Sequence, residues 1–407
     1  MMVPVQTHEQ TLLTGRVVTA GGVLAAGAVV THGDRIRFVG LERDLPADCA
    51  QAQPPAGWRA GRTLLPGLVD VHCHGGAGGE FGAAPESALT ASRHHHVSGT
   101  TSVVASLVSN TPHELRAGVR TCAALVARGD LAGVHLEGPF LSMERRGAQN
   151  PAVLSDVDEA LVASLVREAA DGGAPGSLVQ MTYAPERAGA DALPGLLASH
   201  GIVAAVGHTD ADAATAWAAL RRGRELAVRG GRPLVTHVFN GMPSLHHRSP
   251  GPVAACLAQA ARGDAVLEVV GDGVHLAAET VRMLFDLVGP EALCLITDAM
   301  SASGMPDGTY LLGGQQVRVS DRTARLAEGG SIAGGVATLL DVVRWCVTQA
   351  GVPLVDAVTS ATRTPARSLD LADVGALEVG RLADLLVVDD ELLPVSVLRR
   401  GTWLPAG

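Results

Sequence analysis

Two histidines separated by one residue follow an apolar run near the start of the chain. The segment Leu64–Gly76 reads LLPGLVDVHCHGG, in which His72 and His74 flank Cys73. Because side chains alternate along an extended strand, the two imidazoles lie on one face and the thiol on the other. Two imidazoles at the end of a strand are suitable ligands for a divalent metal ion. This pair alone is a weak signal, so the prediction depends on ligands elsewhere in the chain.

Five further ionisable residues lie at or just past the ends of other apolar runs. They are Glu137 in HLEGPF, His208 in VGHTDA, His237 in THVFN, His275 in GDGVH and Asp298 in TDAMSASG. Neutral imidazoles and carboxylates suit Zn²⁺, Fe²⁺ or a similar ion. A hydrolytic metal site keeps one position open for water and lowers the pKa of that water to about 7. Asp298, which has no arginine neighbour in the sequence, is the candidate to take the water's proton and later deliver it to the leaving group.

Each of these residues also has a structural interpretation. A carboxylate at the end of a strand often caps the next helix, which applies to Glu137 and Asp298. A lone histidine there is more often a hydrogen-bonded core residue, and we expect this of His135. Taken jointly, four histidines and one glutamate at equivalent positions favour a metal site. The tract His94–His96 does not, because consecutive residues on a helix point in different directions.

Eight strand-like apolar runs must position these residues. The runs are, in order, Leu64–Val71, Thr101–Val108, Leu131–Leu136, Leu178–Tyr183, Ile202–Val206, Leu234–Val238, Val266–Val270 and Leu293–Thr297. Helical segments separate most of them, for example Ser155–Ala170 with Ser155 as the expected N-cap. This alternation predicts an α/β fold, a (β/α)₈ TIM-type barrel, whose active site lies at the C-terminal ends of the strands. A doubly wound open sheet is the alternative, but no G-x-G-x-x-G follows an early strand.

Short β segments with glycine turns occupy both ends of the chain. Neither end is long enough to bury a good core alone. We therefore expect residues 1–62 and 376–407 to pair into one small β-sandwich domain, and residues 63–375 to form the barrel.

The composition excludes some classes of binding partner and some catalytic mechanisms. The chain has 407 residues, of which 47% are hydrophobic, and a net charge of −10, so neither nucleic acid nor an anionic membrane surface is an expected partner. All 31 basic residues are arginines, which excludes Schiff-base catalysis and a carboxylated lysine that bridges two metals. The six cysteines form no C-x-x-C, and neither a signal peptide nor a membrane span is recognisable. A reduced cytoplasmic protein is the expectation.

The motifs H-x-H, HLEGPF, VGHTDA, THVFNGMP, GDGVH and TDAM together resemble the amidohydrolase superfamily, over essentially the whole chain. Within it they resemble the N-acetylglucosamine-6-phosphate deacetylase family, whose reaction converts N-acetyl-D-glucosamine 6-phosphate to D-glucosamine 6-phosphate and acetate. The resemblance implies the principal metal ligands Glu137, His208 and His237. It also implies His72 and His74 as ligands of a second ion, and Asp298 as general base and then acid. One or two divalent ions per subunit are expected, with Zn²⁺ favoured over Fe²⁺.

The resemblance also implies residues that bind a phosphorylated amino sugar. They are Ala148, Gln149, Asn240, Gly241, Arg248, His275, Ile332, Ala333 and Gly334. Asn240, the Gly241 backbone N–H and Arg248 match phosphate contacts, and Arg248 is implied to reach the neighbouring subunit's site, hence a homodimer. Gln149 stands where some members carry a histidine that polarises the amide carbonyl. Its NH₂ can still donate a hydrogen bond, so we expect polarisation to depend more on the metal.

Three alternatives stay open at this point. The substrate could be the galactosamine epimer, or the chain could be another amidohydrolase such as a cyclic amidase. Cyclic amidases often need a carboxylated lysine, which this chain cannot make. A non-catalytic barrel scaffold is the third alternative, but such relatives lose ligands that this chain keeps.

Overall fold

The main body of the protein is a barrel of eight parallel strands. The structure is a computed structural model that describes residues 10–59, 61–226 and 228–405. The barrel strands, in hydrogen-bonded order, are β5 (Val69–Cys73), β8 (Ser102–Val108), β9 (Gly133–Glu137), β10 (Leu178–Tyr183), β11 (Val203–Val206), β12 (Leu234–Val235), β13 (Val266–Val269) and β14 (Leu293–Leu295). The order follows the sequence, and each of the eight predicted runs overlaps one of these strands. The barrel prediction is therefore confirmed.

The first and last barrel strands meet at a seam beside the predicted site. The backbone N–H of His74 donates to the carbonyl of Ala299 at 2.7 Å, and that of Asp298 donates to the carbonyl of His72 at 3.0 Å. Deeper in the seam, Thr297 Oγ1 donates to the Asp70 carboxylate at 2.6 Å. These bonds bring the H-x-H motif and Asp298 together, although more than 220 residues of chain separate them.

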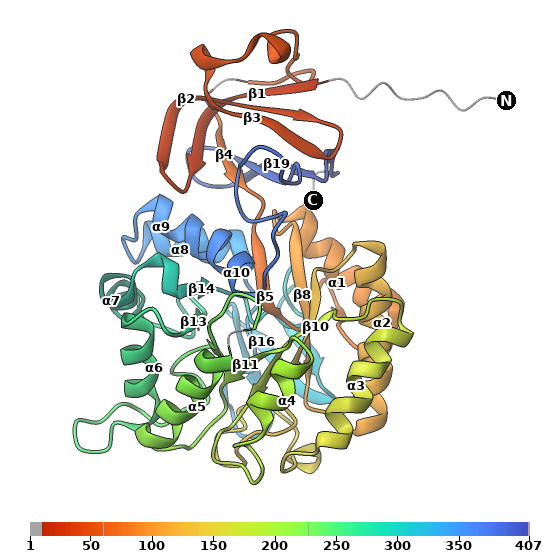
Figure 1. Ribbon diagram of the computed structural model, residues 1–407, viewed down its shortest axis with the longest axis vertical. Coiled ribbons are helices and arrows are strands. Elements are labelled where there is room, and N and C mark those ends of the chain that lie inside the picture. Colours follow the sequence, from red (N-terminus) through yellow and green to blue (C-terminus); the bar gives the residue numbers. More distant parts are fainter. Residues whose placement is uncertain (1–9, 60, 227, 406–407) are drawn as a thin grey trace, which may run out of the picture.

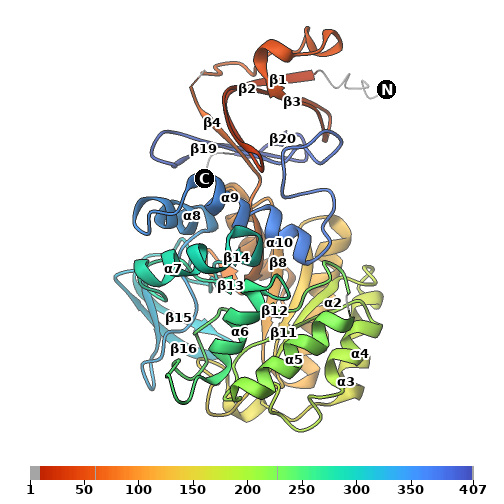
Figure 2. The same cartoon turned by 60° about the vertical axis from the view of Figure 1, so that its left-hand side comes forward.

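Helices surround the barrel (Figures 1 and 2). They are α1 (Pro85–Val97), α2 (Pro112–Arg128), α3 (Glu159–Asp171), α4 (Leu193–Ser199), α5 (Ala213–Leu226), α6 (Gly251–Ala261), α7 (Ala278–Val288), α8 (Leu339–Thr348), α9 (Leu354–Ser360) and α10 (Arg363–Ser368), with short 3₁₀ turns η3 (Pro151–Val153) and η4 (Pro290–Ala292). Two further turns, η1 (Glu42–Asp44) and η2 (Ala47–Cys49), lie outside the barrel, between the strands β3 (Arg35–Leu41) and β4 (Thr63–Pro66) of a second sheet. The expected N-cap at Ser155 is wrong. Helix α3 begins later because the Asp158 side chain accepts from the backbone N–H groups of Ala160 and Leu161.

Both ends of the chain contribute to a second sheet. Its seven strands, in order, are β20 (Thr402–Trp403), β19 (Pro394–Arg399), β18 (Leu385–Val388), β4 (Thr63–Pro66), β1 (Gln10–Thr19), β2 (Gly22–His32) and β3 (Arg35–Leu41). The two ends join this sheet through β4, which pairs with β1 on one side and β18 on the other. The sandwich is not confirmed, since all seven strands belong to one hydrogen-bonded sheet. Residues 1–9 of the expected domain lie outside the described residues.

The apolar run Leu64–Val71 is not one strand but two. Its first part belongs to β4 in the terminal sheet, and its second part begins β5 in the barrel. The chain breaks the strand at Pro66 and Gly67, where proline has no N–H to donate and a Cβ on Gly67 would lie 2.2 Å from Thr101 Oγ1. Residues 63–66 thus pair outside the barrel, contrary to the expected boundary; the boundary at 375/376 stays a prediction.

A small antiparallel sheet lies between β14 and α8 in the sequence. Its strands are β15 (Gly308–Leu312), β16 (Gln315–Ser320) and β17 (Thr323–Leu326), and a separate two-stranded pair joins β6 (Gly75–Gly76) to β7 (Gly79–Glu80). The sequence analysis did not predict these elements. The terminal sheet lies against the end of the barrel where β5 begins, so the C-terminal ends of the barrel strands are at the opposite end of the molecule (Figure 1).

The largest apolar cluster packs the surrounding helices onto the barrel strands. A second one fills the terminal sheet. All six cysteines are buried and free. Within the described ranges, no helix has the length and apolarity needed to cross a bilayer.

Candidate active site

The carboxylate of Glu137 lies among four imidazoles at the C-terminal end of the barrel. Its Oε1 atom is 2.9 Å from His208 Nε2, 3.0 Å from His237 Nε2 and 3.5 Å from His72 Nε2. Its Oε2 atom is 3.3 Å from His74 Nε2. All five side chains are buried. The structure thus brings together the five residues predicted as metal ligands.

Asp298 completes this cluster from the other side of the barrel seam. Its Oδ1 atom is 3.2 Å from His74 Nε2 and 3.5 Å from His72 Nε2, and those two nitrogens are 3.1 Å apart. Two ligands that each lie about 2.0–2.1 Å from a tetrahedral ion are separated by about 3.3 Å. The spacing of these atoms is therefore that of ligands which share an ion.

Two groups of three residues have the geometry of a metal site. One is His72, His74 and Asp298, and the other is His72, Glu137 and His237; within each group the ligand atoms lie within 4.8 Å of one another. His72 belongs to both groups. Glu137 contacts imidazoles of both groups and also His208, so its carboxylate is placed where a ligand could bridge two ions.

The charges of the cluster balance one another. Burial disfavours the charged imidazole of His72, but the carboxylates of Glu268 and Glu137 outweigh it and raise its pKa to about 9. Burial likewise opposes charging of His74, and Asp298 and Glu137 raise its pKa to about 10. Burial alone would raise the pKa of Asp298, but the neighbouring His74 and His72 hold it well below its usual range. The carboxylates thus favour positive charge at this cluster, as the binding of a divalent cation requires.

Three of the predicted site residues have a left-handed backbone. The φ angles are 47° at His208, 26° at His237 and 49° at Asp298. Non-glycine residues seldom adopt positive φ, and residues held in such strained conformations are enriched at functional sites. Each of these residues lies where the chain leaves a barrel strand. The backbone is thus strained at three positions whose side chains belong to the cluster.

In three of the imidazoles, the Nδ1 atom lies within hydrogen-bond distance of an acceptor. His72 Nδ1 lies 2.9 Å from Glu268 Oε2, while His74 Nδ1 lies 3.0 Å from the carbonyl of Ser106 and His208 Nδ1 lies 2.8 Å from that of Arg145. A neutral imidazole that donates from Nδ1 keeps its Nε2 lone pair for a metal. The sequence analysis missed Glu268, although a charged residue inside the apolar run VLEVV was a detectable signal.

A cavity of about 330 Å³ opens onto this cluster. Besides His74, Glu137, His208, His237 and Asp298, it is lined by Ala148, Gln149, Asn240, Gly241, His275, Ile332 and Gly334, which the sequence analysis predicted, and by Gly147, Leu312 and Ser331, which it missed. His72 does not line it but lies buried behind it. The predicted substrate residues are thus largely gathered around one space, next to the metal cluster.

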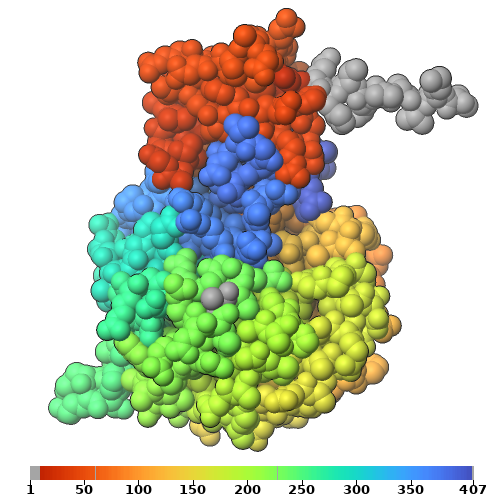
Figure 3. Space-filling view, in the orientation of Figure 1, coloured from red at the N-terminus to blue at the C-terminus, as the bar shows by residue number. Residues whose placement is uncertain are grey.

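Two predicted substrate residues, Ala333 and Arg248, do not line this cavity; for Arg248 the prediction was a contact with the neighbouring subunit's site. Ala333 is buried in an apolar cluster with Met300, and its N–H donates to the carbonyl of Ala324, so its side chain does not line the cavity. Arg248 is exposed on the segment between β12 and α6, which projects from the barrel (Figures 1 and 3). Within this chain, Arg248 does not line the cavity.

His275 is oriented toward the cavity by an acidic neighbour. Its Nδ1 atom lies 2.9 Å from Asp272 Oδ2, and the backbone N–H of His275 donates to Asp272 Oδ1. Burial disfavours a charged His275, but the Asp272 carboxylate raises its pKa above the ordinary value. The sequence analysis did not identify Asp272, which precedes His275 in the same GDGVH motif.

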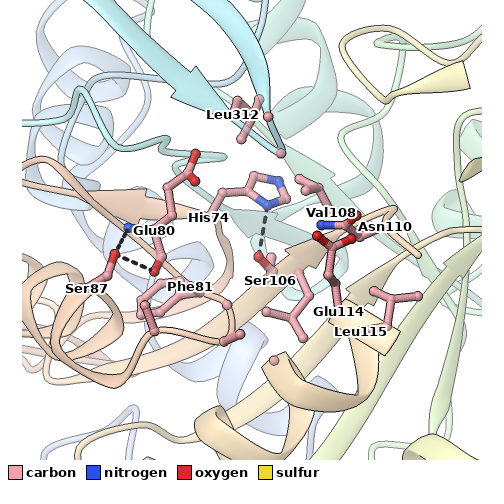
Figure 4. A pocket seen from close by; sticks show the side chains of 17 residues that line it. His74, Glu80, Phe81, Ser87, Ser106, Val108, Asn110, Glu114, Leu115 and Leu312 are labelled. Carbon is pink, nitrogen blue, oxygen red and sulfur yellow. Dashed lines mark hydrogen bonds between the residues drawn. The ribbon is translucent and has the colours of Figure 1, made fainter. Parts of the chain in front are cut away.

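A second cavity, of about 310 Å³, lies beside the first (Figure 4). The two cavities share His74 and Leu312 as lining residues. Figure 4 shows Glu80 to one side of His74 and Ser106 below it, and His74 Nδ1 lies 3.0 Å from the backbone carbonyl of Ser106. The second cavity has an apolar wall, to which Phe81, Val108 and Leu115 contribute. Asn110 and Glu114 also line it.

Comparisons with known proteins agree with this geometry. The sequence model of the Amidohydrolase family matches residues 63–402. The chain is 31% identical to the N-acetylglucosamine-6-phosphate deacetylase of Bacillus subtilis over 95% of this chain and 94% of that one. It is 32% identical to that of Homo sapiens over 82% and 81% of the two chains.

Solved structures of similar proteins share the whole architecture. The N-acetyl-D-glucosamine-6-phosphate deacetylase of Mycobacterium smegmatis, in complex with N-acetyl-D-glucosamine-6-phosphate, superposes with a TM-score of 0.88 at 37% identity, over 97% of this chain and 99% of that one. The enzyme of Thermotoga maritima gives a TM-score of 0.81 at 25% identity, over 97% and 99%. The chain therefore belongs to the amidohydrolase family, and its relatives there include N-acetylglucosamine-6-phosphate deacetylases.

Proposed function

We propose that this protein hydrolyses the acetamide of N-acetyl-D-glucosamine 6-phosphate to D-glucosamine 6-phosphate and acetate. The observation that carries the proposal is the convergence of four imidazoles and two carboxylates beside one cavity at the barrel mouth. The similarity to deacetylases over nearly the full length of the chain supports the choice of substrate.

We propose that Glu137, His208 and His237 bind one divalent ion and that His72 and His74 contribute to a second. The donor set of imidazole nitrogens and carboxylate oxygens favours Zn²⁺, with Fe²⁺ as the alternative. A bound ion would act as a Lewis acid and lower the pKa of water toward about 7. Whether one or two ions bind depends on how His72 is shared between the two groups of ligands.

Asp298 is the proposed proton carrier. Its carboxylate lines the cavity, and the neighbouring imidazoles favour the ionised form, which is the form that can accept a proton. It then returns that proton to the nitrogen of the leaving amine. His275, held by Asp272, is placed to donate a hydrogen bond to the oxyanion that forms at the acetamide carbonyl.

The proposed substrate residues divide the cavity between the sugar and its phosphate. Asn240 and the backbone N–H of Gly241 are proposed to bind phosphate, and Ile332 and Gly334 to lie near the sugar. A Cβ on Gly241 would lie 2.9 Å from His208 Nδ1, so this approach to the ligand histidine requires glycine. We further propose that Arg248 reaches the phosphate in the neighbouring subunit of a homodimer. The free cysteines are consistent with a cytoplasmic protein.

Acetate release from a panel of N-acetylated hexosamines tests the function. The panel contains the glucosamine and galactosamine epimers, each with and without 6-phosphate, and metal content is measured on the same preparations. We expect the highest kcat/KM for N-acetyl-D-glucosamine 6-phosphate and stoichiometric divalent metal. Preference for the galactosamine epimer, or for an unphosphorylated sugar, would overturn the substrate assignment. Metal-free protein without activity would favour a scaffold.

A further inference from the structure

We infer that Glu268 is a positioning residue that holds His72 in the tautomer able to bind a metal ion. Glu268 lies within β13, and its side chain is wholly buried inside the barrel. The inference rests on the proposed function, because it concerns the metal centre of that same site. It adds a residue that does not touch the cavity.

The Glu268 carboxylate is surrounded by donors. Its Oε2 atom lies 2.9 Å from His72 Nδ1 and 3.4 Å from the backbone nitrogen of His237. Its Oε1 atom accepts from Gln180 Nε2 at 2.6 Å. An ionised carboxylate is an acceptor only, so all three contacts suit the same state. These hydrogen bonds stabilise the buried carboxylate, and no arginine is among its partners in the described part of the chain.

This contact determines which nitrogen of His72 is free. A neutral imidazole carries one N–H, and Glu268 accepts it from Nδ1, so Nε2 keeps its lone pair. That Nε2 atom lies 3.1 Å from His74 Nε2 and 3.5 Å from both Glu137 Oε1 and Asp298 Oδ1. The lone pair thus points into the ligand cluster. With the proton on Nε2 instead, His72 could not bind an ion in the cluster through this atom.

His72 differs from the other imidazoles of the cluster in the acceptor that faces its Nδ1 atom. The Nδ1 atoms of His74 and His208 face backbone carbonyls, and that of His237 has no partner among the described residues. Among these four histidines, only His72 has a carboxylate as the acceptor at Nδ1. A charged acceptor makes a stronger hydrogen bond than a carbonyl and raises the basicity of the ligand. Because His72 belongs to both candidate metal groups, Glu268 is placed to affect both.

A purely structural role is the competing explanation. Through Gln180 and the backbone of His237, Glu268 also joins β13 to β10 and to the end of β12. Loss of that role would lower the stability of the barrel. It would not change the affinity for metal in protein that remains folded, and this difference allows a test.

The test compares metal binding by metal-free wild-type protein and the Glu268→Gln variant. Each is titrated with Zn²⁺ against a chromophoric chelator, and the visible spectrum of the Co²⁺-loaded protein reports the ligand field. Substitution of a residue behind a ligand typically weakens metal binding by about 10- to 100-fold, and we expect that loss here. We also expect an altered Co²⁺ spectrum with a far-UV circular dichroism spectrum like that of the wild type.

Asp70→Asn is the matched control. Asp70 is equally buried and bonds the backbone N–H of His72 and the Thr297 hydroxyl, but not an imidazole. We expect this variant to keep wild-type metal affinity even if its stability changes. Equal losses of metal affinity in the two variants would show that loss of either buried carboxylate weakens metal binding. That result would overturn the specific role of Glu268.

A second variant covers the case in which Glu268→Gln does not fold. Glu268→Asp keeps the charge but withdraws it from His72 by one methylene, so we expect a folded protein with weakened metal binding. Wild-type affinity and an unchanged Co²⁺ spectrum in either folded variant would overturn the inference. A wild-type protein that binds no divalent metal would instead contradict the proposed function.

Discussion

Gln149 Nε2 donates a hydrogen bond of 2.5 Å to Oε2 of Glu137, the carboxylate at the centre of the imidazole cluster. The other end of the same amide, Oε1, accepts from the backbone N–H of Ser109 at 2.8 Å. The sequence analysis assigned Gln149 to the substrate carbonyl. In the structure one of its two N–H groups is already used to orient Glu137, which leaves one for a substrate.

Gln149→Leu should therefore affect the metal site as well as the substrate. Without the amide, Glu137 loses the donor to Oε2, and we expect metal affinity to fall by about 10-fold or more. Competition with a chelator measures this. Asn150→Ala is the control, because Asn150 caps the adjacent turn η3 and is not a lining residue of the cavity. Unchanged metal affinity together with a raised KM would restrict Gln149 to substrate binding.

Asp298→Asn tests the proton carrier. The amide keeps the shape of the side chain but cannot accept the water's proton, so kcat should fall by about 10² or more, as expected for loss of general acid–base catalysis. The protein should still bind metal through the imidazoles and Glu137. Steady-state kinetics and metal analysis on the same sample measure both effects. Near-native turnover would contradict the assignment.

Arg248→Ala tests recognition of the phosphate. If Arg248 binds phosphate across a dimer, its loss should raise KM for the phosphorylated sugar far more than for N-acetylglucosamine. Arg221→Ala, which removes an exposed arginine of α5, should leave both values unchanged. Analytical ultracentrifugation of the wild type reports the dimer independently. Equal losses on the two substrates would argue against a phosphate contact.

His95 should make the protein sensitive to acid. Burial, reinforced by the nearby charge of His94, lowers the pKa of His95 to about 4 against a bond to the Gly75 carbonyl, whereas the unfolded value is about 6.5. Because the folded pKa is the lower one, the stability that depends on neutral His95 is fully present above pH 6.5. It is lost as the pH falls toward 4, by up to about 3 kcal/mol.

Urea unfolding of metal-free protein at pH 7 and pH 5 measures this loss. The midpoint for the wild type should fall with pH, and His95→Gln should reduce that fall, because glutamine does not titrate but still donates to Gly75. His113→Gln, at an exposed histidine, should leave the pH dependence unchanged. The same slope in the wild type and in His95→Gln would show that other groups cause the acid sensitivity.

The sequence alone determined the barrel and the residues at its mouth. Eight apolar runs alternating with helices admit few folds, and that fold places residues such as Glu137 and Asp298 at one end whatever the details of packing. The dipeptide Pro66-Gly67 was a signal for the break in the run Leu64–Val71, although the sequence analysis took the run as one strand. The sequence could not determine which sheet each half joins, because that depends on strand pairing distant in sequence. It did not predict the sheet of β15–β17 either.

Only the tertiary structure decided which groups stand behind the ligands. Glu268 reaches His72 across 196 residues of chain, and Gln149 reaches Glu137 because of the path of one loop. Local periodicity specifies which face of a strand a side chain occupies, but a hydrogen-bond partner is set by the register between strands and by the course of loops. For the same reason Ala333 lies in an apolar cluster, although its motif places it beside the substrate.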